Sequence, residues 1–117
     1  MGAGASTAKH PFPDEAAALA AGAGWVHVEG LSNPTAVVAD LPRIAAQAHG
    51  AGALLSVDST FATPTNHKAL SDGADRVLHS ATRCLGGHND LLAGTLTGPR
   101  ELVDPLRKAL GVLGGIM

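Results

Sequence analysis

The chain has 117 residues, of which 45% are hydrophobic and only 3% aromatic, a composition that suits one domain with a marginally stable core. Its formal net charge of −2 argues against a role on nucleic acid or anionic lipid, and no run reaches the ~18 apolar residues of a membrane span. A single cysteine excludes an internal disulfide and suits a reducing compartment, so we expect a cytoplasmic protein.

The first part of the chain predicts little regular structure. Residues 1–12 are small, polar or proline without periodicity, and we predict that they are disordered. An alanine-rich segment predicts a short helix at 13–21. Residues 26–29 predict a strand, and the composition of 30–34 indicates a loop.

The middle of the chain alternates helices and strands. Asp40 can cap a helix that ends at Gly50 and whose apolar face consists of Leu41, Ile44, Ala45 and Ala48. The apolar runs 53–57 and 76–79 predict buried parallel strands, joined by a segment with a helix at 66–71. A right-handed crossover then brings the polar residues that follow the two runs to one edge of the sheet, where α/β proteins bind ligands.

The last part predicts one more strand and one more helix. The strand is expected at 91–97, and Gly98 and Pro99 start a helix with an apolar face of Leu102, Val103, Leu106 and Leu110. Pro105 removes a backbone hydrogen bond inside that helix, so we predict a kink, or a restart with Asp104 as the cap. Together these elements predict an α/β domain with a mainly parallel sheet flanked by helices.

Two strings carry a family resemblance: VDSTFATP at 57–64 and HSATRCLGGHND at 79–90. They resemble the paired signatures of the cystathionine gamma-synthase and cystathionine beta-lyase (trans-sulfuration) family, whose members use pyridoxal phosphate (PLP) in cysteine and methionine metabolism. The resemblance implies that residues 13–117 are the central slice of a PLP-dependent transferase-like large domain, of the fold type I, aspartate aminotransferase-like class. A complete member would be several times longer.

The resemblance also implies a set of cofactor-binding residues. Asp58 holds the place of the carboxylate that keeps the PLP ring nitrogen protonated, so that the ring can accept electrons. Ser80 and Thr82 look like the hydroxyls that hold the phosphate, and Thr60 belongs to the same motif as Asp58. Asn33 would lie near the phenolic oxygen of the cofactor. The residues alone leave open a turn-capping aspartate, ordinary loop polarity and a turn asparagine.

Arg83 departs from the family pattern, in which SATK is followed by an aromatic residue and the lysine bonds covalently to PLP. A guanidinium keeps its proton at neutral pH and cannot attack an aldehyde. The other lysines are Lys9, Lys68 and Lys108, away from this loop. We therefore expect PLP or a related anion to bind noncovalently at best. We also expect this chain to be inactive in the family chemistry, which makes or breaks carbon–sulfur bonds at the β or γ carbon of amino acids.

Other functions remain open. The chain can be a noncatalytic binding or regulatory module that forms a homo-oligomer or pairs with a full-length homologue, or it can be the product of a nonfunctional gene fragment. Its six histidines show no metal-ligand spacing, so no metal site is predicted. Cys84 lacks a recognisable catalytic partner and is expected to be buried.

Overall fold

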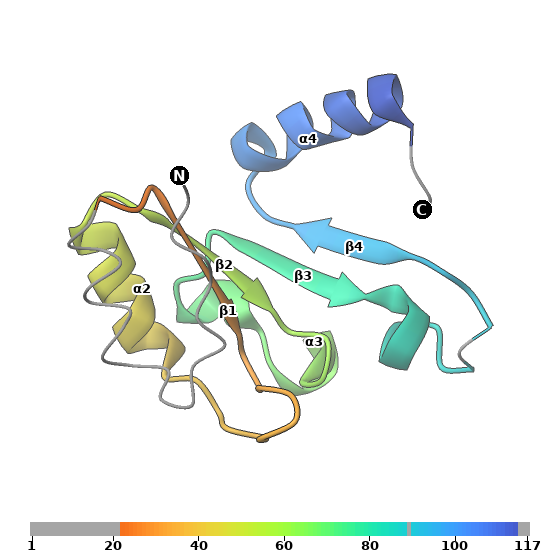
Figure 1. Ribbon diagram of the computed structural model, residues 1–117, viewed down its shortest axis with the longest axis horizontal. Helices are drawn as coiled ribbons and strands as arrows, with labels where there is room; N and C mark the ends of the chain where they lie inside the picture. The colour runs from red at the N-terminus through yellow and green to blue at the C-terminus, as the bar shows by residue number, and fades with distance from the viewer. Residues whose placement is uncertain (1–21, 89, 115–117) are drawn as a thin grey trace.

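A computed structural model describes residues 22–88 and 90–114 (Figure 1). The disordered segment predicted at 1–12 and the helix predicted at 13–21 lie outside the described residues. The elements follow one another as β1 (Trp25–Glu29), α2 (Leu41–Gly50), β2 (Leu54–Asp58), α3 (Thr63–Asn66), η1 (Ala69–Asp72), β3 (Arg76–Ser80), η2 (Ala81–Leu85), β4 (Gly94–Thr97) and α4 (Arg100–Leu113).

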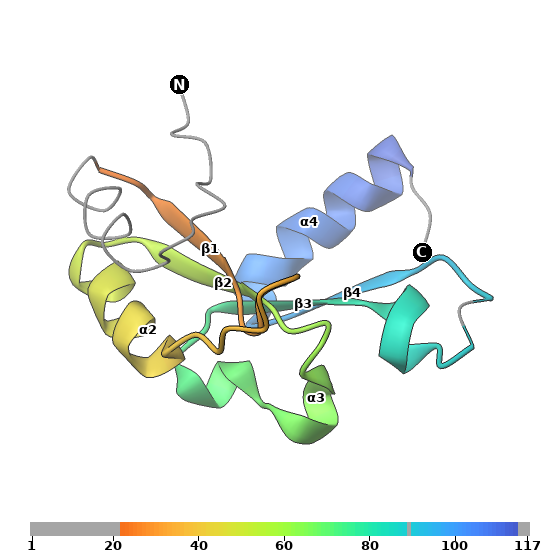
Figure 2. The same cartoon turned by 60° about the horizontal axis from the view of Figure 1, so that its bottom comes forward.

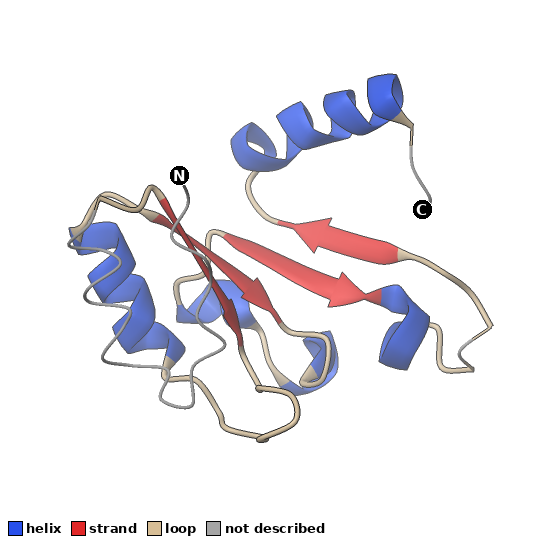
Figure 3. Ribbon diagram, viewed as in Figure 1, coloured by secondary structure: helices blue, strands red, loops and turns tan. Residues whose placement is uncertain are grey.

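The four strands form one mixed sheet in the order β1-β2-β3-β4 (Figure 3). β1, β2 and β3 are parallel, with Glu29 opposite Asp58 and Asp58 opposite Leu78. β4 runs antiparallel to β3. The predicted α/β architecture with a mainly parallel sheet is therefore confirmed. The last strand is shorter than the predicted 91–97, because the exposed residues before Gly94 do not pair with β3.

The hydrophobic core lies between α2 and one face of the sheet. The α2 helix begins as predicted, with the Asp40 carboxylate accepting a hydrogen bond from Arg43 N at 3.3 Å. Its predicted apolar face is buried, and the core it joins is Leu41, Ile44, Ala45, Ala48, Ala53, Leu55, Val57, Ala69, Ala74 and Val77. Figure 2 shows α2 and α3 on one side of the sheet and α4 on the other. The two sides therefore differ in how fully they are covered.

The single helix predicted at 66–71 is wrong. The structure has two short helical segments, α3 and η1, separated by His67 in an extended conformation (φ −147°, ψ 127°). Pro64 lies at the start of α3, where its missing N–H is not needed, and this moves the helix upstream of the predicted range. A hydrogen bond of 2.7 Å from His67 Nε2 to Asp72 Oδ2 holds the break between the two segments.

Of the kink or restart predicted at Pro105, the restart is wrong. α4 is one helix of 14 residues that runs from Arg100 to Leu113 with Pro105 inside it. An interior proline removes the hydrogen bond that its own N–H would donate, and its ring crowds the carbonyl four residues earlier, yet the helix continues through Pro105. Within the described part of the chain, no helix has the length and apolar character that crossing a bilayer requires.

Candidate functional site

The ends of β2 and β3 bring polar side chains to the carboxyl edge of the sheet. Asp58 is the last residue of β2 and Ser80 the last residue of β3. Asp58 is paired with Leu78, and side chains alternate along a strand, so Asp58 and Ser80 project from the same face. This is the face opposite α2, because the neighbouring Val57 is buried in the core.

Thr60 joins the two strand ends through hydrogen bonds. Its backbone N and its Oγ1 both donate to Asp58 Oδ1, at 2.9 and 2.6 Å. Its Oγ1 also accepts from Ser80 N at 2.9 Å. Asp58 Oδ1 is therefore engaged, whereas Asp58 Oδ2 and Ser80 Oγ have no hydrogen-bond partner among the described residues. These two oxygens remain available to a bound molecule.

The strand ends open into a hollow of about 490 Å³, within the usual ~300–1,000 Å³ of small-molecule sites. The residues that line it are Glu29, Leu31, Asn33, Asp58, Thr60, Phe61, Ser80 and Arg83. The structure thus brings together five positions singled out in the sequence, which are Asn33, Asp58, Thr60, Ser80 and Arg83. Glu29, Leu31 and Phe61 were not singled out.

Glu29 enters the site because β1 ends beside β2. It lies opposite Asp58 in the sheet, and its Oε2 accepts a hydrogen bond from Asn33 N at 3.0 Å. Gly30 N donates to Asp58 O at 2.9 Å, which fixes the start of the loop that carries Asn33. The signal that could have identified Glu29 is the one used for Asp58, an acidic residue at the end of a predicted strand.

Thr82 differs from the other predicted residues. Its hydroxyl accepts from Ala93 N at 3.1 Å and donates to Ala93 O at 3.4 Å, and the residue does not line the hollow. These bonds connect η2 to the segment that leads into β4. The Thr82 hydroxyl is therefore occupied by backbone groups in this structure.

Arg83 lies in η2 directly after β3, with a backbone conformation (φ −90°, ψ −118°) that interrupts the helical turn. Its side chain is exposed and lines the hollow. Lys68 precedes η1 and Lys108 lies on α4, and neither lines the hollow. Within the described ranges the hollow thus contains no primary amine. The neighbouring Cys84 is exposed, so the expectation of a buried cysteine is wrong.

The hollow fits the expected cofactor in part. A protonated ring nitrogen could donate to Asp58 Oδ2, and a phosphate could accept from Ser80 Oγ and pair with Arg83. An aldehyde finds no amine with which to form a covalent bond. No group of three or more histidine, cysteine or acidic side chains that could hold a metal ion is found in 22–88 or 90–114.

Comparison with protein-family models matches residues 10–117 to the family described as Cys/Met metabolism PLP-dependent enzyme. Among curated proteins, the chain is 49% identical over 89 residues to "Cystathionine gamma-synthase 1, chloroplastic" of Nicotiana tabacum. It is 42% identical over 93 residues to "Cystathionine gamma-lyase" of Bacillus subtilis (strain 168). These alignments cover 76% and 79% of this chain.

Solved structures give the same result. A cystathionine gamma synthase from Xanthomonas oryzae pv. oryzae, in complex with aminoacrylate and cysteine, matches 86% of this chain with a TM-score of 0.82 and 39% identity. The apo form of CalE6, a methionine gamma lyase from Micromonospora echinospora, matches 89% of the chain with a TM-score of 0.81 and 35% identity. The chain spans only 16–29% of the length of these relatives.

Proposed function

This chain belongs to the family of Cys/Met metabolism PLP-dependent enzymes, and from that premise we propose that it binds PLP, without a covalent bond, in the hollow at the ends of β2 and β3. One observation carries the proposal. The hydrogen bonds of Thr60 occupy one oxygen of Asp58 and the backbone of Ser80, and they leave Asp58 Oδ2 and Ser80 Oγ free beside the same hollow.

Different polar groups of the hollow would hold the ring nitrogen and the phosphate of the cofactor. Asp58 would pair with the protonated ring nitrogen, because an opposite charge at hydrogen-bonding distance favours the charged form of the ring. Ser80 and Arg83 would hold the phosphate, the hydroxyl by one hydrogen bond and the guanidinium by a charge-assisted pair. Bound PLP supplies an electron sink for reactions at amino-acid carbons. Thr60 would keep the Asp58 carboxylate in a fixed orientation toward that sink.

Arg83 separates this proposal from the activity of the relatives. The residue at this position has to lose a proton to bond to the cofactor and must then move protons on the substrate, and arginine does neither at neutral pH. We therefore propose that the chain, as given, does not catalyse formation or cleavage of carbon–sulfur bonds.

The test is titration of the chain with PLP, followed by borohydride reduction and peptide mapping. We expect saturable binding and no stoichiometric label. Arg83→Lys should gain a label at position 83, while Asp58→Asn should weaken binding about tenfold or more. Lys68→Arg is the matched control, because PLP reacts weakly with exposed lysines, and it should change nothing. Stoichiometric labelling of the unmodified chain, or binding unaffected by Asp58→Asn, would contradict the proposal.

A second function is favoured by the exposure of α4. The apolar residues of this helix remain exposed, with Leu106 at 43%, Leu110 at 50% and Leu113 at 83%. A noncatalytic module that pairs with a full-length homologue, or with a second copy, would cover them. Size-exclusion chromatography and crosslinking of the chain, alone and with a homologue, test this alternative. A monodisperse monomer that unfolds cooperatively and does not bind the homologue would count against this alternative.

The place of the protein in the cell is also a proposal. The single cysteine of the chain favours a reducing compartment, and we propose the cytoplasm. Among the matched relatives, the cystathionine gamma-synthase 1 of Nicotiana tabacum is described as chloroplastic. Fractionation of cells that express the protein at native level would distinguish the two locations.

A further inference from the structure

The hollow lacks the group that recognises an aldehyde. Three phosphorylated pyridines share the ring nitrogen and the phosphate and differ only at carbon 4′, which is an aldehyde in PLP, an aminomethyl group in pyridoxamine phosphate and a hydroxymethyl group in pyridoxine phosphate. A protein separates the aldehyde from the others most strongly by a covalent bond to an amine. Among the described residues, the lining of the hollow offers a guanidinium and no amine.

The groups that remain contact the parts that the three molecules have in common. Asp58 Oδ2 would pair with a ring nitrogen, and the Ser80 hydroxyl with the Arg83 guanidinium would hold a phosphate. Changing the substituent on carbon 4′ from aldehyde to amine or alcohol alters neither of these two partners. Recognition through them therefore gives nearly equal binding free energies for the three molecules.

The charge of the hollow does not exclude the aminomethyl form. Two carboxylates, from Glu29 and Asp58, and one guanidinium, from Arg83, line it, so the negative side chains outnumber the positive one. Glu29 Oε2 also accepts a hydrogen bond from Asn33 N. Pyridoxamine phosphate carries an additional ammonium at neutral pH, which a carboxylate-rich lining attracts rather than repels.

From this lining we infer that the hollow is a site for phosphorylated pyridines that does not select for the aldehyde, and that it binds pyridoxamine phosphate and pyridoxine phosphate as well as PLP. The inference rests on the proposed function, because it uses the same polar groups of the hollow. The inference adds the class of ligand to the proposed function. With Arg83 in place of an amine, all three molecules can bind, and not the aldehyde alone.

The experiment is isothermal titration of the full chain with each of the three molecules at the same pH and salt. We expect the dissociation constants of pyridoxamine phosphate and pyridoxine phosphate to lie within about fivefold of that of PLP. An affinity for PLP that exceeds both by more than about fivefold would overturn the inference and leave the proposed function standing. If none of the three binds, the proposed function fails as well, so the two failures are distinguishable.

Variants of the chain test whether position 83 is the cause. Arg83→Lys should shift the preference toward PLP by about tenfold or more, because the new amine can bond to the aldehyde alone. Asp58→Asn should weaken all three ligands by a similar factor. Arg107→Lys makes the same exchange on α4, away from the hollow, and should leave all three affinities unchanged. If Arg83→Lys still binds pyridoxine phosphate and its preference for PLP over the other two molecules is unchanged, the inference is overturned.

Borohydride reduction and mass spectrometry of the same samples count any PLP attached to Lys9, Lys68, Lys108 or the N-terminus. Pyridoxine phosphate has no aldehyde and cannot form such adducts, so its affinity reports the hollow directly. Lys68→Arg with Lys108→Arg should leave the affinity for pyridoxine phosphate unchanged. Loss of that affinity in this double variant would show binding elsewhere and would also contradict the inference.

Discussion

The helices α2 and α4 have the same kind of sequence and opposite environments (Figure 2). Both are amphipathic, but the apolar side chains of α2 are buried, Leu41 at 1% and Ile44 at 2% exposed, whereas none of the α4 residues is buried. The difference teaches that helical periodicity provides an apolar face and does not provide the surface that covers it. α2 has the valine-rich face of β2 and β3, and α4 has no comparable surface within the described residues.

The candidate site lies at the boundary between these two regions. Asp58 and Thr60 follow the strand that packs on α2, while Arg83 lies in the turn that leads toward β4 and α4. The first two are therefore supported by the core, and Arg83 is supported mainly by local backbone bonds. Changes in the α2 region should alter both stability and the site, whereas changes on α4 should alter neither by much. The four predictions below test this contrast.

The largest effect is expected from truncating the buried face of α2. Ile44→Ala should lower the free energy of unfolding by about 2–5 kcal/mol, because the side chain leaves a cavity in the core, or should unfold the chain outright. Leu106→Ala removes a comparable side chain from α4, where Leu106 is 43% exposed, and should cost less than about 1 kcal/mol. Urea unfolding followed by circular dichroism measures both values. Equal losses would mean that α4 is as well packed as α2.

The next effect comes from the close approach of the η1 end to α2. Gly73 has φ +98°, and a Cβ there would lie 2.7 Å from Ala45 Cβ, so Gly73→Ala should cost about 2–4 kcal/mol in backbone strain and overpacking. Gly52 has φ +75° with nothing within 4 Å of such a Cβ, so Gly52→Ala should cost only about 1 kcal/mol.

Adding Ala45→Gly to Gly73→Ala separates the two causes of this loss. The second substitution removes the clashing Cβ, so its cost in the Gly73→Ala background should be smaller than in the unmodified chain. Additive losses in the double-mutant cycle would show that the contact with α2 contributes nothing.

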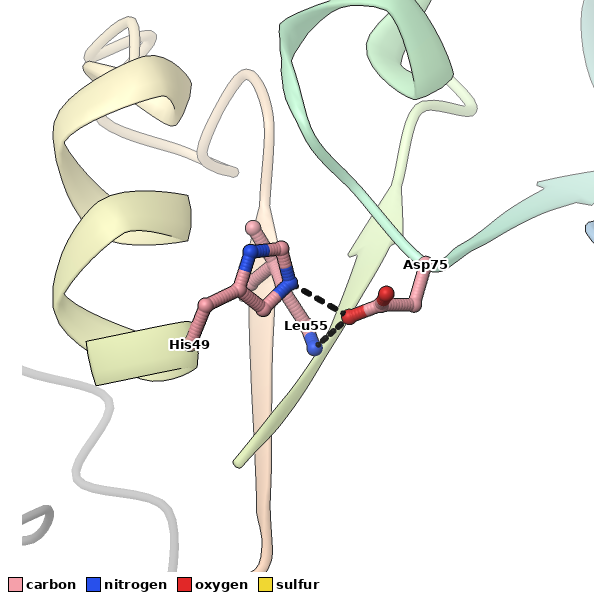
Figure 4. Close-up of polar contacts among 3 residues, drawn as sticks. All are labelled: His49, Leu55 and Asp75. Carbon is pink, nitrogen blue, oxygen red and sulfur yellow. Dashed lines mark hydrogen bonds and ion pairs between the residues drawn. The ribbon is translucent and has the colours of Figure 1, made fainter. Parts of the chain in front are cut away.

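A smaller effect is expected from the polar contact that links α2 to the start of β2 (Figure 4). Asp75 Oδ2 accepts from Leu55 N at 2.7 Å and from His49 Nε2 at 2.9 Å. Asp75→Ala should cost about 1–3 kcal/mol, because the buried Leu55 N–H loses its acceptor. His49→Ala removes only the bond of a side chain that is 46% exposed and should cost less than about 1 kcal/mol.

Thermal unfolding measures the loss of stability in Asp75→Ala and in His49→Ala. Hydrogen exchange at the Leu55 amide identifies the source of each loss. Exchange should accelerate in Asp75→Ala and stay slow in His49→Ala. Acceleration of similar size in the two variants would assign the effect to the histidine instead.

The smallest effect has the opposite sign. Ser56 lies in β2 with 0% exposure, and its hydroxyl has no hydrogen-bond partner among the described residues. Ser56→Ala should raise the free energy of unfolding by up to about 1 kcal/mol, because a buried polar atom without a partner is removed. The exposed Ser71 provides the control, and Ser71→Ala should change it by less than about 0.5 kcal/mol. Destabilisation by Ser56→Ala would indicate that this hydroxyl has a partner in solution.

Local patterns predicted the parts of the fold that local interactions build. The α2 helix, its Asp40 cap and its buried face follow from spacing and from one side chain in the first turn. Two helix predictions were wrong, and both concern segments that contain a proline. The predicted helix at 66–71 is broken at His67 between α3 and η1, and α4 does not restart at Pro105. At α3 the proline lies in the first turn of the helix, whereas at Pro105 the helix continues through the proline.

The composition of the site was less predictable than its location. The sequence placed Asp58 and Ser80 at adjacent strand ends, and it also named Asn33 and Thr82. It could not reveal that Thr60 connects the two strand ends, because that bond joins residues 20 positions apart in the chain. It also gave no reason to include Phe61, a residue of the loop after β2 that lines the hollow.

The sequence by itself determined the family, the order of helices and strands around the core, and the loss of the amine at position 83, because motifs, periodicity and the chemistry of one side chain are local properties. Only the tertiary structure decided that Glu29 faces Asp58, that the Thr82 hydroxyl is occupied by Ala93, and that α4 lies exposed. These three results depend on which surfaces and backbone groups meet in space. The spacing of residues within a single segment does not predict these contacts between segments.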